Sequence, residues 1–73
     1  MPAEDLYKLI LQNINRLDPD DARFELNQLF KITKINFNKE IEELKDPDVV
    51  GKPKVLKKIR QQITHQFKAY QKN

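Results

Sequence analysis

The sequence predicts an all-α fold, a small bundle of three main helices with the middle one broken or followed by a short fourth. The chain has 73 residues, of which one is Gly, none is Trp and 34% are charged. This composition suits helices better than a sheet, which needs more turn residues. Apolar residues also recur at helical spacing in stretches that Pro-containing boundaries separate. At this length we expect one domain over residues 1–73 with a small core.

The C-terminal stretch from Gly51 to Asn73 predicts a basic amphipathic helix that begins at Pro53 and ends near Gln71. At 100° per residue its apolar side chains form one narrow stripe, which consists of Leu56, Ile59, Ile63, Phe67 and Tyr70. The opposite face carries Lys54, Lys57, Lys58, His65, Lys68 and Lys72, and Arg60 lies nearer the side of the stripe.

The N-terminal stretch predicts a helix from about Ala3 to Leu17. Pro2 suits a first turn, where its missing N–H costs nothing, and the acidic residues that follow complement the positive end of the helix dipole. Leu6, Ile10 and Leu17 share one face. Asn13 lies on the same face and therefore needs a polar partner or a place at the edge of the interface.

The run Asp18-Pro19-Asp20-Asp21 marks the start of a second helix. Asp18 is a good N-cap and Pro19 a good first residue, so the run predicts capping and not a calcium loop, which would need alternating ligands and a central Gly. The buried face of this helix is predicted to hold Ala22, Leu26, Leu29, Phe30 and Thr33. Phe24 lies opposite, where we expect it to face a third helix and join the core.

The middle of the chain predicts a helix break near Ile35 and a restart around Asn38, with Asn36 and Asn38 as potential caps. One continuous helix to Lys45 is the alternative, but it would be more than twice the usual length. Residues 46–53 contain two Pro and the only Gly, so we expect a loop with its two Val side chains beneath the bundle. The predicted core consists of Leu6, Ile10, Leu17, Leu26, Leu29, Phe30, Phe37, Ile41, Leu44, Leu56, Ile59, Ile63 and Phe67.

Charge is divided along the chain. Residues 1–48 carry seven Lys/Arg and eleven Asp/Glu, a net of −4, whereas residues 49–73 carry seven Lys/Arg and no acid, a net of +7. One interpretation is that the basic helix neutralises its acidic neighbours within the fold. The other is that it presents a cationic surface to an anionic partner.

The residues that catalysis or metal binding requires are not grouped in this sequence. A single His, no Cys and no G-x-S-x-G pattern leave no pairing of nucleophile and base, so we expect no enzyme, no cofactor and no metal. No apolar run approaches the roughly 20 residues of a membrane span. The acidic N-terminus is unlike a signal peptide, and with the absence of Cys it predicts an intracellular protein, cytoplasmic or nuclear.

Two local patterns resemble known families. Leu44-Lys45, Val50-Gly51-Lys52 and Leu56-Lys57-Lys58 resemble the N-terminal helical domain of elongation factor TFIIS and its relatives, which implies binding to proteins of the transcription machinery. The Trp-Lys pair near the end of that domain is absent here. The segments 25–29 and 56–63 resemble the helices of a small two-helix protein of the large ribosomal subunit, a similarity that leaves the first helix unexplained. We assign the chain to neither family.

The basic helix therefore predicts that the chain is a non-catalytic interaction module that binds an anionic partner, a nucleic acid or ribonucleoprotein. The predicted anion-binding residues are Lys54, Lys57, Lys58, Arg60, His65, Lys68 and Lys72. Lysines contact phosphates as point charges and position a protein without reading base sequence. The alternatives are an adaptor that docks on an acidic protein surface, self-association through the near-heptad apolar positions of the last helix, and a face that is only solvated.

Overall fold

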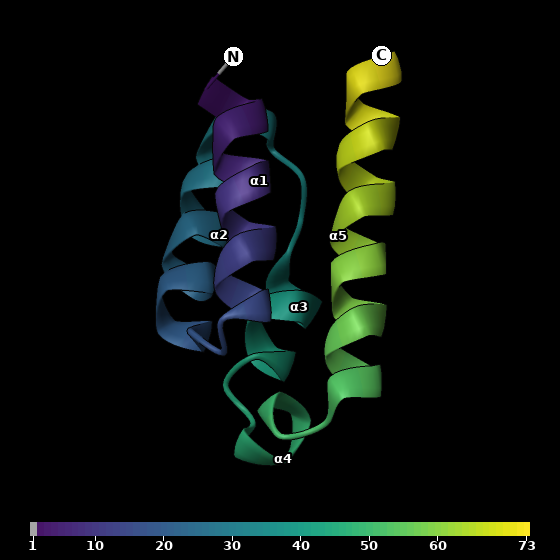
Figure 1. The fold of residues 1–73 in the computed structure, drawn as a ribbon. Helices are drawn as coiled ribbons and strands as arrows, with labels where there is room; N and C mark the ends of the chain where they lie inside the picture. The colour runs from purple at the N-terminus through teal and green to yellow at the C-terminus, as the bar shows by residue number, and fades with distance from the viewer. Residues whose placement is uncertain (1) are drawn as a thin grey trace.

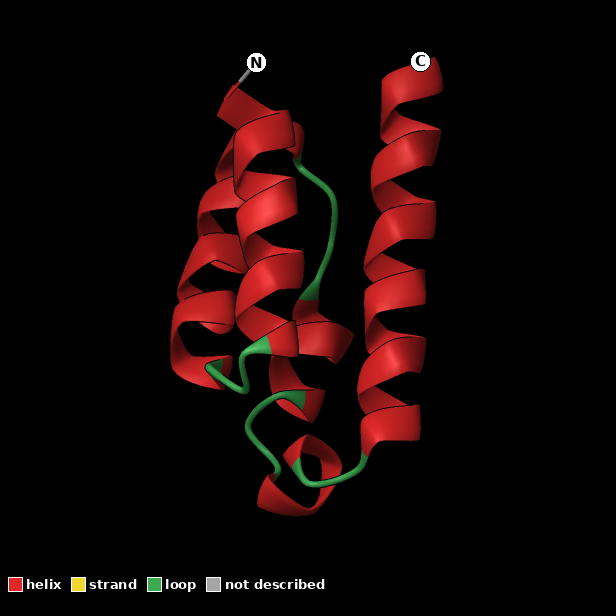
Figure 2. Cartoon of the chain, viewed as in Figure 1, coloured by secondary structure: helices red, strands yellow, loops and turns green. Residues whose placement is uncertain are grey.

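The computed structural model describes residues 2–73, and within these residues it contains five helices and no strand (Figures 1 and 2). The helices are α1 (Pro2–Asn15), α2 (Pro19–Thr33), α3 (Asn38–Glu43), α4 (Pro47–Val50) and α5 (Pro53–Lys72). The all-α bundle of three main helices, α1, α2 and α5, is confirmed, and the chain between α2 and α5 holds two short helices. The molecule measures 34 × 18 × 18 Å. At 1.5 Å per residue, α5 alone extends over about 30 Å, most of the long axis.

The long helices follow one another up and down the molecule (Figure 1). α1 and α2 form an antiparallel pair, and the segment after α2 returns along the bundle to α3 and α4 at the far end. α5 then runs back, so that the start of α1 and the end of α5 lie at the same end of the molecule. α5 is therefore antiparallel to α1, and the two helices lie next to each other over much of their length.

The core draws apolar side chains from both halves of the chain. It consists of Ala3, Ile10, Ile14, Ala22, Leu26, Leu29, Phe37, Leu44, Leu56, Ile59, Ile63 and Phe67. The predicted stripe of α5 is confirmed, because its first four members are buried and Tyr70 packs against them. Leu6 and Ile41, also predicted as core, are partly buried against the same cluster. Buried Asn13 has the partner it needs, since its Nδ2 donates to Glu25 Oε1 at 2.5 Å.

The prediction that Leu17 belongs to the first helix and to the core is wrong. α1 ends at Asn15, and Leu17 has a left-handed backbone with φ of 58° and an exposure of 62%. The Leu17 N–H bonds to Ile14 O and the Asp18 N–H to Asn13 O, which is the Schellman arrangement that ends many helices. This backbone turn carries the Leu17 side chain away from the face that the helical count assigned to it.

Two Phe side chains of α2 were also wrongly predicted as core. Phe24 is 64% exposed, because within residues 2–73 no helix covers the face of α2 that lies opposite its buried residues. Phe30 is 43% exposed at the edge of the buried face, where Lys34 Nζ lies 5.8 Å from the centre of its ring. An exposed aromatic ring beside a cation is favourable, though worth less than full burial.

The boundaries of the helices follow their caps. Asp18 caps α2 as predicted, because its Oδ1 accepts the Asp21 N–H at 3.3 Å. The break after α2 and the restart at Asn38 are confirmed, although the residue at the N-cap position of α3 is Phe37 and not an Asn. Residues 46–53 are not simply a loop: Asp46 accepts the Asp48 N–H at 2.9 Å and begins the one-turn helix α4.

Candidate anion-binding surface

The orientation of α5 is fixed by contacts with α1 near the end where both termini lie. The rings of Tyr7 and Phe67 stack with centroids 4.5 Å apart. The Tyr7 hydroxyl also donates to Thr64 Oγ1 at 2.8 Å. Together with the buried stripe, this stacked pair and hydrogen bond set which side of α5 faces solvent.

The seven predicted anion-binding residues lie on the outer and lateral faces of α5. Six of them are exposed and Arg60 is partly buried. No Asp or Glu occurs anywhere in α5. The surface of this helix therefore carries cations near both of its ends and no acids.

Ion pairs are confined to the other part of the molecule. Within residues 2–73 there are three: Lys8 with Glu4 at 3.9 Å, Lys45 with Glu42 at 3.1 Å, and Arg23 with Asp20. None of them involves a cation of α5. In the described residues, therefore, no carboxylate neutralises the basic helix by direct pairing.

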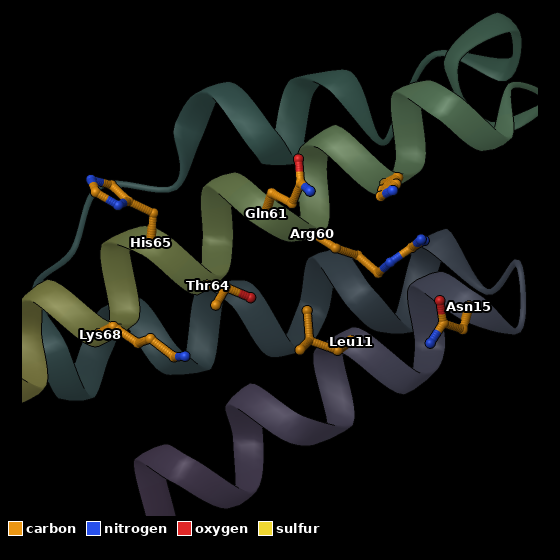
Figure 3. Close-up of a pocket in the computed structure, with 8 residues that line it drawn as sticks. Leu11, Asn15, Arg60, Gln61, Thr64, His65 and Lys68 are labelled. Atoms are coloured by element: carbon orange, nitrogen blue, oxygen red, sulfur yellow. The ribbon is translucent and has the colours of Figure 1, made fainter.

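A groove of about 570 Å³ runs between α1 and α5 (Figure 3). We call it the α1–α5 groove; its lining includes Leu11 and Asn15 of α1 and Lys57, Arg60, Thr64 and Lys68 of α5. His65 is at its margin and points away from α1 (Figure 3). The groove divides the cations of α5 into a groove trio, Lys57, Arg60 and Lys68, and an outer trio, Lys54, Lys58 and Lys72.

The hollow continues toward the end of α1 that is far from the termini. Asn15 and Arg60 line both the α1–α5 groove and the adjoining depression, whose other walls include Leu17, Val50 and Leu56. This extension is mainly apolar. The surface thus combines a cationic wall on α5 with an apolar floor that begins at Leu11.

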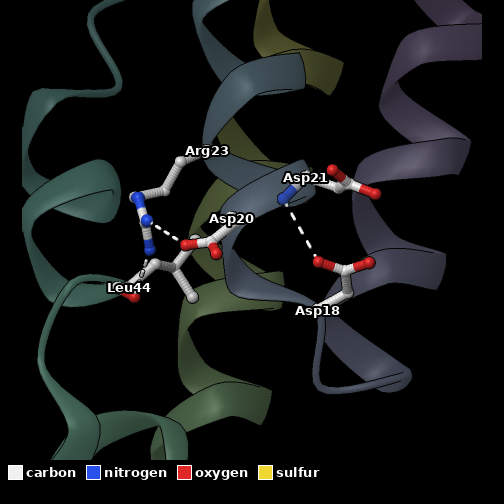
Figure 4. Close-up of polar contacts among 5 residues, drawn as sticks. All are labelled: Asp18, Asp20, Asp21, Arg23 and Leu44. Atoms are coloured by element: carbon white, nitrogen blue, oxygen red, sulfur yellow. Dashed lines mark hydrogen bonds and ion pairs between the residues drawn. The ribbon is translucent and has the colours of Figure 1, made fainter.

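The acidic residues around the start of α2 interact with their own neighbours (Figure 4). Arg23 donates to Leu44 O at 2.9 Å and pairs with Asp20, so this cation ties α2 to the turn after α3. A hydrogen bond with the Asp18 side chain and repulsion by its charge raise the pKa of Asp21. Asp18, Asp20 and Arg23 thus make local contacts of a kind that no cation of α5 makes in the described residues.

Comparisons of the chain with protein-family models, curated proteins and solved structures gave no match. Among residues 2–73, no helix has the length and hydropathy that crossing a bilayer requires. Sequence reasoning placed the cations on α5 but missed Leu11 and Asn15, the α1 side of the groove. The available signal was that Leu11 is apolar and yet lies outside the predicted apolar face of the first helix; no signal marked Asn15.

Proposed function

We propose that this chain is a non-catalytic module that binds nucleic acid through the cations of α5. The observation that supports it is the row of Lys and Arg side chains on this helix, none of which is paired with a carboxylate in the described residues. A helix that offers exposed cations without competing acids gains affinity for phosphates by releasing counterions.

The contacts involve the phosphate backbone and not the base edges. Five of the six cations in the two trios are Lys, which act as point charges. The only Arg is partly buried in the wall of the α1–α5 groove, where its guanidinium is less able to reach into a major groove. Binding is therefore expected to be independent of base sequence and to depend strongly on salt.

The test is a fluorescence-anisotropy titration of labelled single-stranded and duplex oligonucleotides over a range of salt concentrations. Changing the groove trio together to Gln, or the outer trio together to Gln, should weaken binding to a similar extent. Each variant should lower the magnitude of the log–log salt slope by up to about 3, because each removed cation leaves one phosphate without its neutralising partner.

A charge-matched control comes from three exposed lysines outside α5, namely Lys31, Lys34 and Lys39. Changing this control trio to Gln removes the same net charge from the chain but leaves α5 untouched. Its affinity and salt slope should stay near those of the wild type. Equal losses in all three variants would contradict the proposal, because net charge and not the α5 surface would then determine affinity.

A further inference from the structure

We propose that the α1–α5 groove is a docking site for an acidic amphipathic helix of a partner protein. The occupant has an apolar stripe that enters the groove and carboxylates on the flank that faces α5. This proposal goes beyond phosphate contact, because a charged phosphate gains no favourable contact from the apolar floor of the groove.

The floor supplies the apolar contacts. Leu11 begins it, and Leu17, Val50 and Leu56 continue it in the adjoining depression. Leu17 lines each of the three hollows around the far end of α1, although 62% of its surface is exposed and it contributes little to the core. An exposed Leu inside a hollow is a contact point for an incoming apolar side chain.

The wall supplies the complementary charge. The groove trio lines it without any Asp or Glu among the lining residues of the groove or of the adjoining depression. Arg60 lines both hollows, and its planar guanidinium can receive a carboxylate there in a bidentate pair. A partner with carboxylates beside its apolar stripe satisfies both the wall and the floor.

The length and the lining of the groove favour a helix over a nucleic-acid strand. Across the groove and the adjoining depression, the α5 wall extends from Pro53 to Lys68, about 22 Å or four helical turns, which is long enough for the i, i+4 and i+7 anchors of a docked helix. Single-stranded nucleic acids stack their bases on aromatic rings. Among the described residues that line the groove, only His65 has a ring, and it points away from α1 (Figure 3).

The test uses two labelled synthetic peptides titrated against the full chain by fluorescence anisotropy at about 0.15 M salt. The probe is a helix-forming peptide of about four turns, with Leu at i, i+4, i+7 and i+11 and Glu on the flanks. The control peptide has the same composition with the Leu positions permuted, so that the stripe is absent. The probe should bind about tenfold more tightly than the control peptide. Equal binding of the two peptides would overturn the proposal.

The two trios then locate the site. Changing the groove trio to Gln should weaken probe binding about tenfold, whereas changing the outer trio should alter it by about twofold or less. Nucleic-acid binding, in contrast, should fall to a similar extent in both variants. The two proposals can therefore fail separately, and equal losses of probe affinity would overturn this one only.

A pair of exposed apolar residues tests the floor. Leu17→Asn should weaken binding of the probe peptide about fivefold. The chain should stay folded, because Asn tolerates the left-handed backbone at this position. Phe24→Asn, at a residue equally exposed on α2, should leave probe affinity unchanged. Probe affinity that is unchanged in Leu17→Asn would contradict the proposal. A dimer in sedimentation equilibrium that Leu17→Asn dissociates would also overturn it, because a second copy would then be the occupant.

Discussion

The region from α1 to α4 and the helix α5 use their charged residues in different ways. In the first region carboxylates cap helices at Asp18 and Asp46, and three ion pairs join neighbouring turns. In α5 the fold uses the apolar stripe and the hydrogen bond of Thr64 with Tyr7, and no cation is paired with an acid in the described residues. The difference shows that charged side chains make structural contacts in the first region, whereas the cations of α5 form no ion pair in the described residues.

The largest expected effect is at the stripe of α5. Ile63 is completely buried, and Ile63→Ala should lower the free energy of unfolding by about 2–5 kcal/mol through reduced burial and a residual cavity. Urea denaturation followed by circular dichroism measures the change. Ile32→Ala, at a residue that is 47% exposed on α2, is the matched control and should cost much less. Equal losses would show that α5 does not anchor the core.

The next effect is at the cap of α2. Asp18→Ala should cost about 0.5–2 kcal/mol, because the Asp21 N–H loses its acceptor. Asp18→Asn should retain most of the stability, since Asn also caps helices well. Thermal unfolding of the two variants beside the wild type separates the cap from the charge. An Asn variant as unstable as the Ala variant would mean that the carboxylate charge, and not the hydrogen bond, stabilises this turn.

A smaller effect, with a defined pH dependence, is expected at Glu25. Burial raises its pKa, as do the charges of Asp21 and Asp18, although the hydrogen bond from Asn13 lowers it. Because the folded pKa lies above the unfolded value, the native state holds the proton more tightly. The contribution of this group to stability is therefore fully present below the ordinary pKa of Glu. It declines as the pH rises from that value through the raised pKa of the folded state.

Glu25→Gln tests this linkage, because Gln keeps an acceptor for Asn13 and removes the charge. The variant should have a higher Tm than the wild type at pH 7. The difference should shrink toward zero below the ordinary pKa of Glu, about 4.3. Melting curves from about pH 3 to 7 supply the measurement. A difference that grows as the pH falls would contradict the expected sign.

The smallest effect on stability is expected at the cations of α5. Changing the outer trio to Gln should alter the free energy of unfolding by no more than about 0.5 kcal/mol per site, because these side chains are exposed and unpaired in the described residues. The control trio in the acidic region should behave similarly. A much larger loss from the outer trio would show that these lysines do stabilise the bundle.

The elements that could be predicted from the sequence are those whose signals are local. Pro53 and the apolar stripe defined α5, and the Asp18-Pro19 pair defined the start of α2. The exposure of Leu17 depends on a left-handed residue that is not Gly or Asn, so no turn signal marked it. The exposure of Phe24 depends on which face of α2 the other helices leave uncovered. The periodicity of a single helix does not give that information.

The same limit applies to the candidate site. The cations of α5 could be predicted because they share one helix, and helical geometry orders them. Their division into a groove trio and an outer trio depends on where α1 lies against α5. The contacts among Tyr7, Thr64 and Phe67 set that placement, and they join residues far apart in the sequence.

The most direct test of the central claim uses a variant with both trios changed to Gln, measured for folding and for binding in the same preparation. Circular dichroism should show native helicity, with a Tm near that of the wild type. Anisotropy with the labelled oligonucleotide should stay flat at concentrations that saturate the wild type and the control trio variant. A folded variant that binds the oligonucleotide as tightly as the wild type, or a variant that unfolds, would contradict the claim that the charges of α5 serve binding and not the fold.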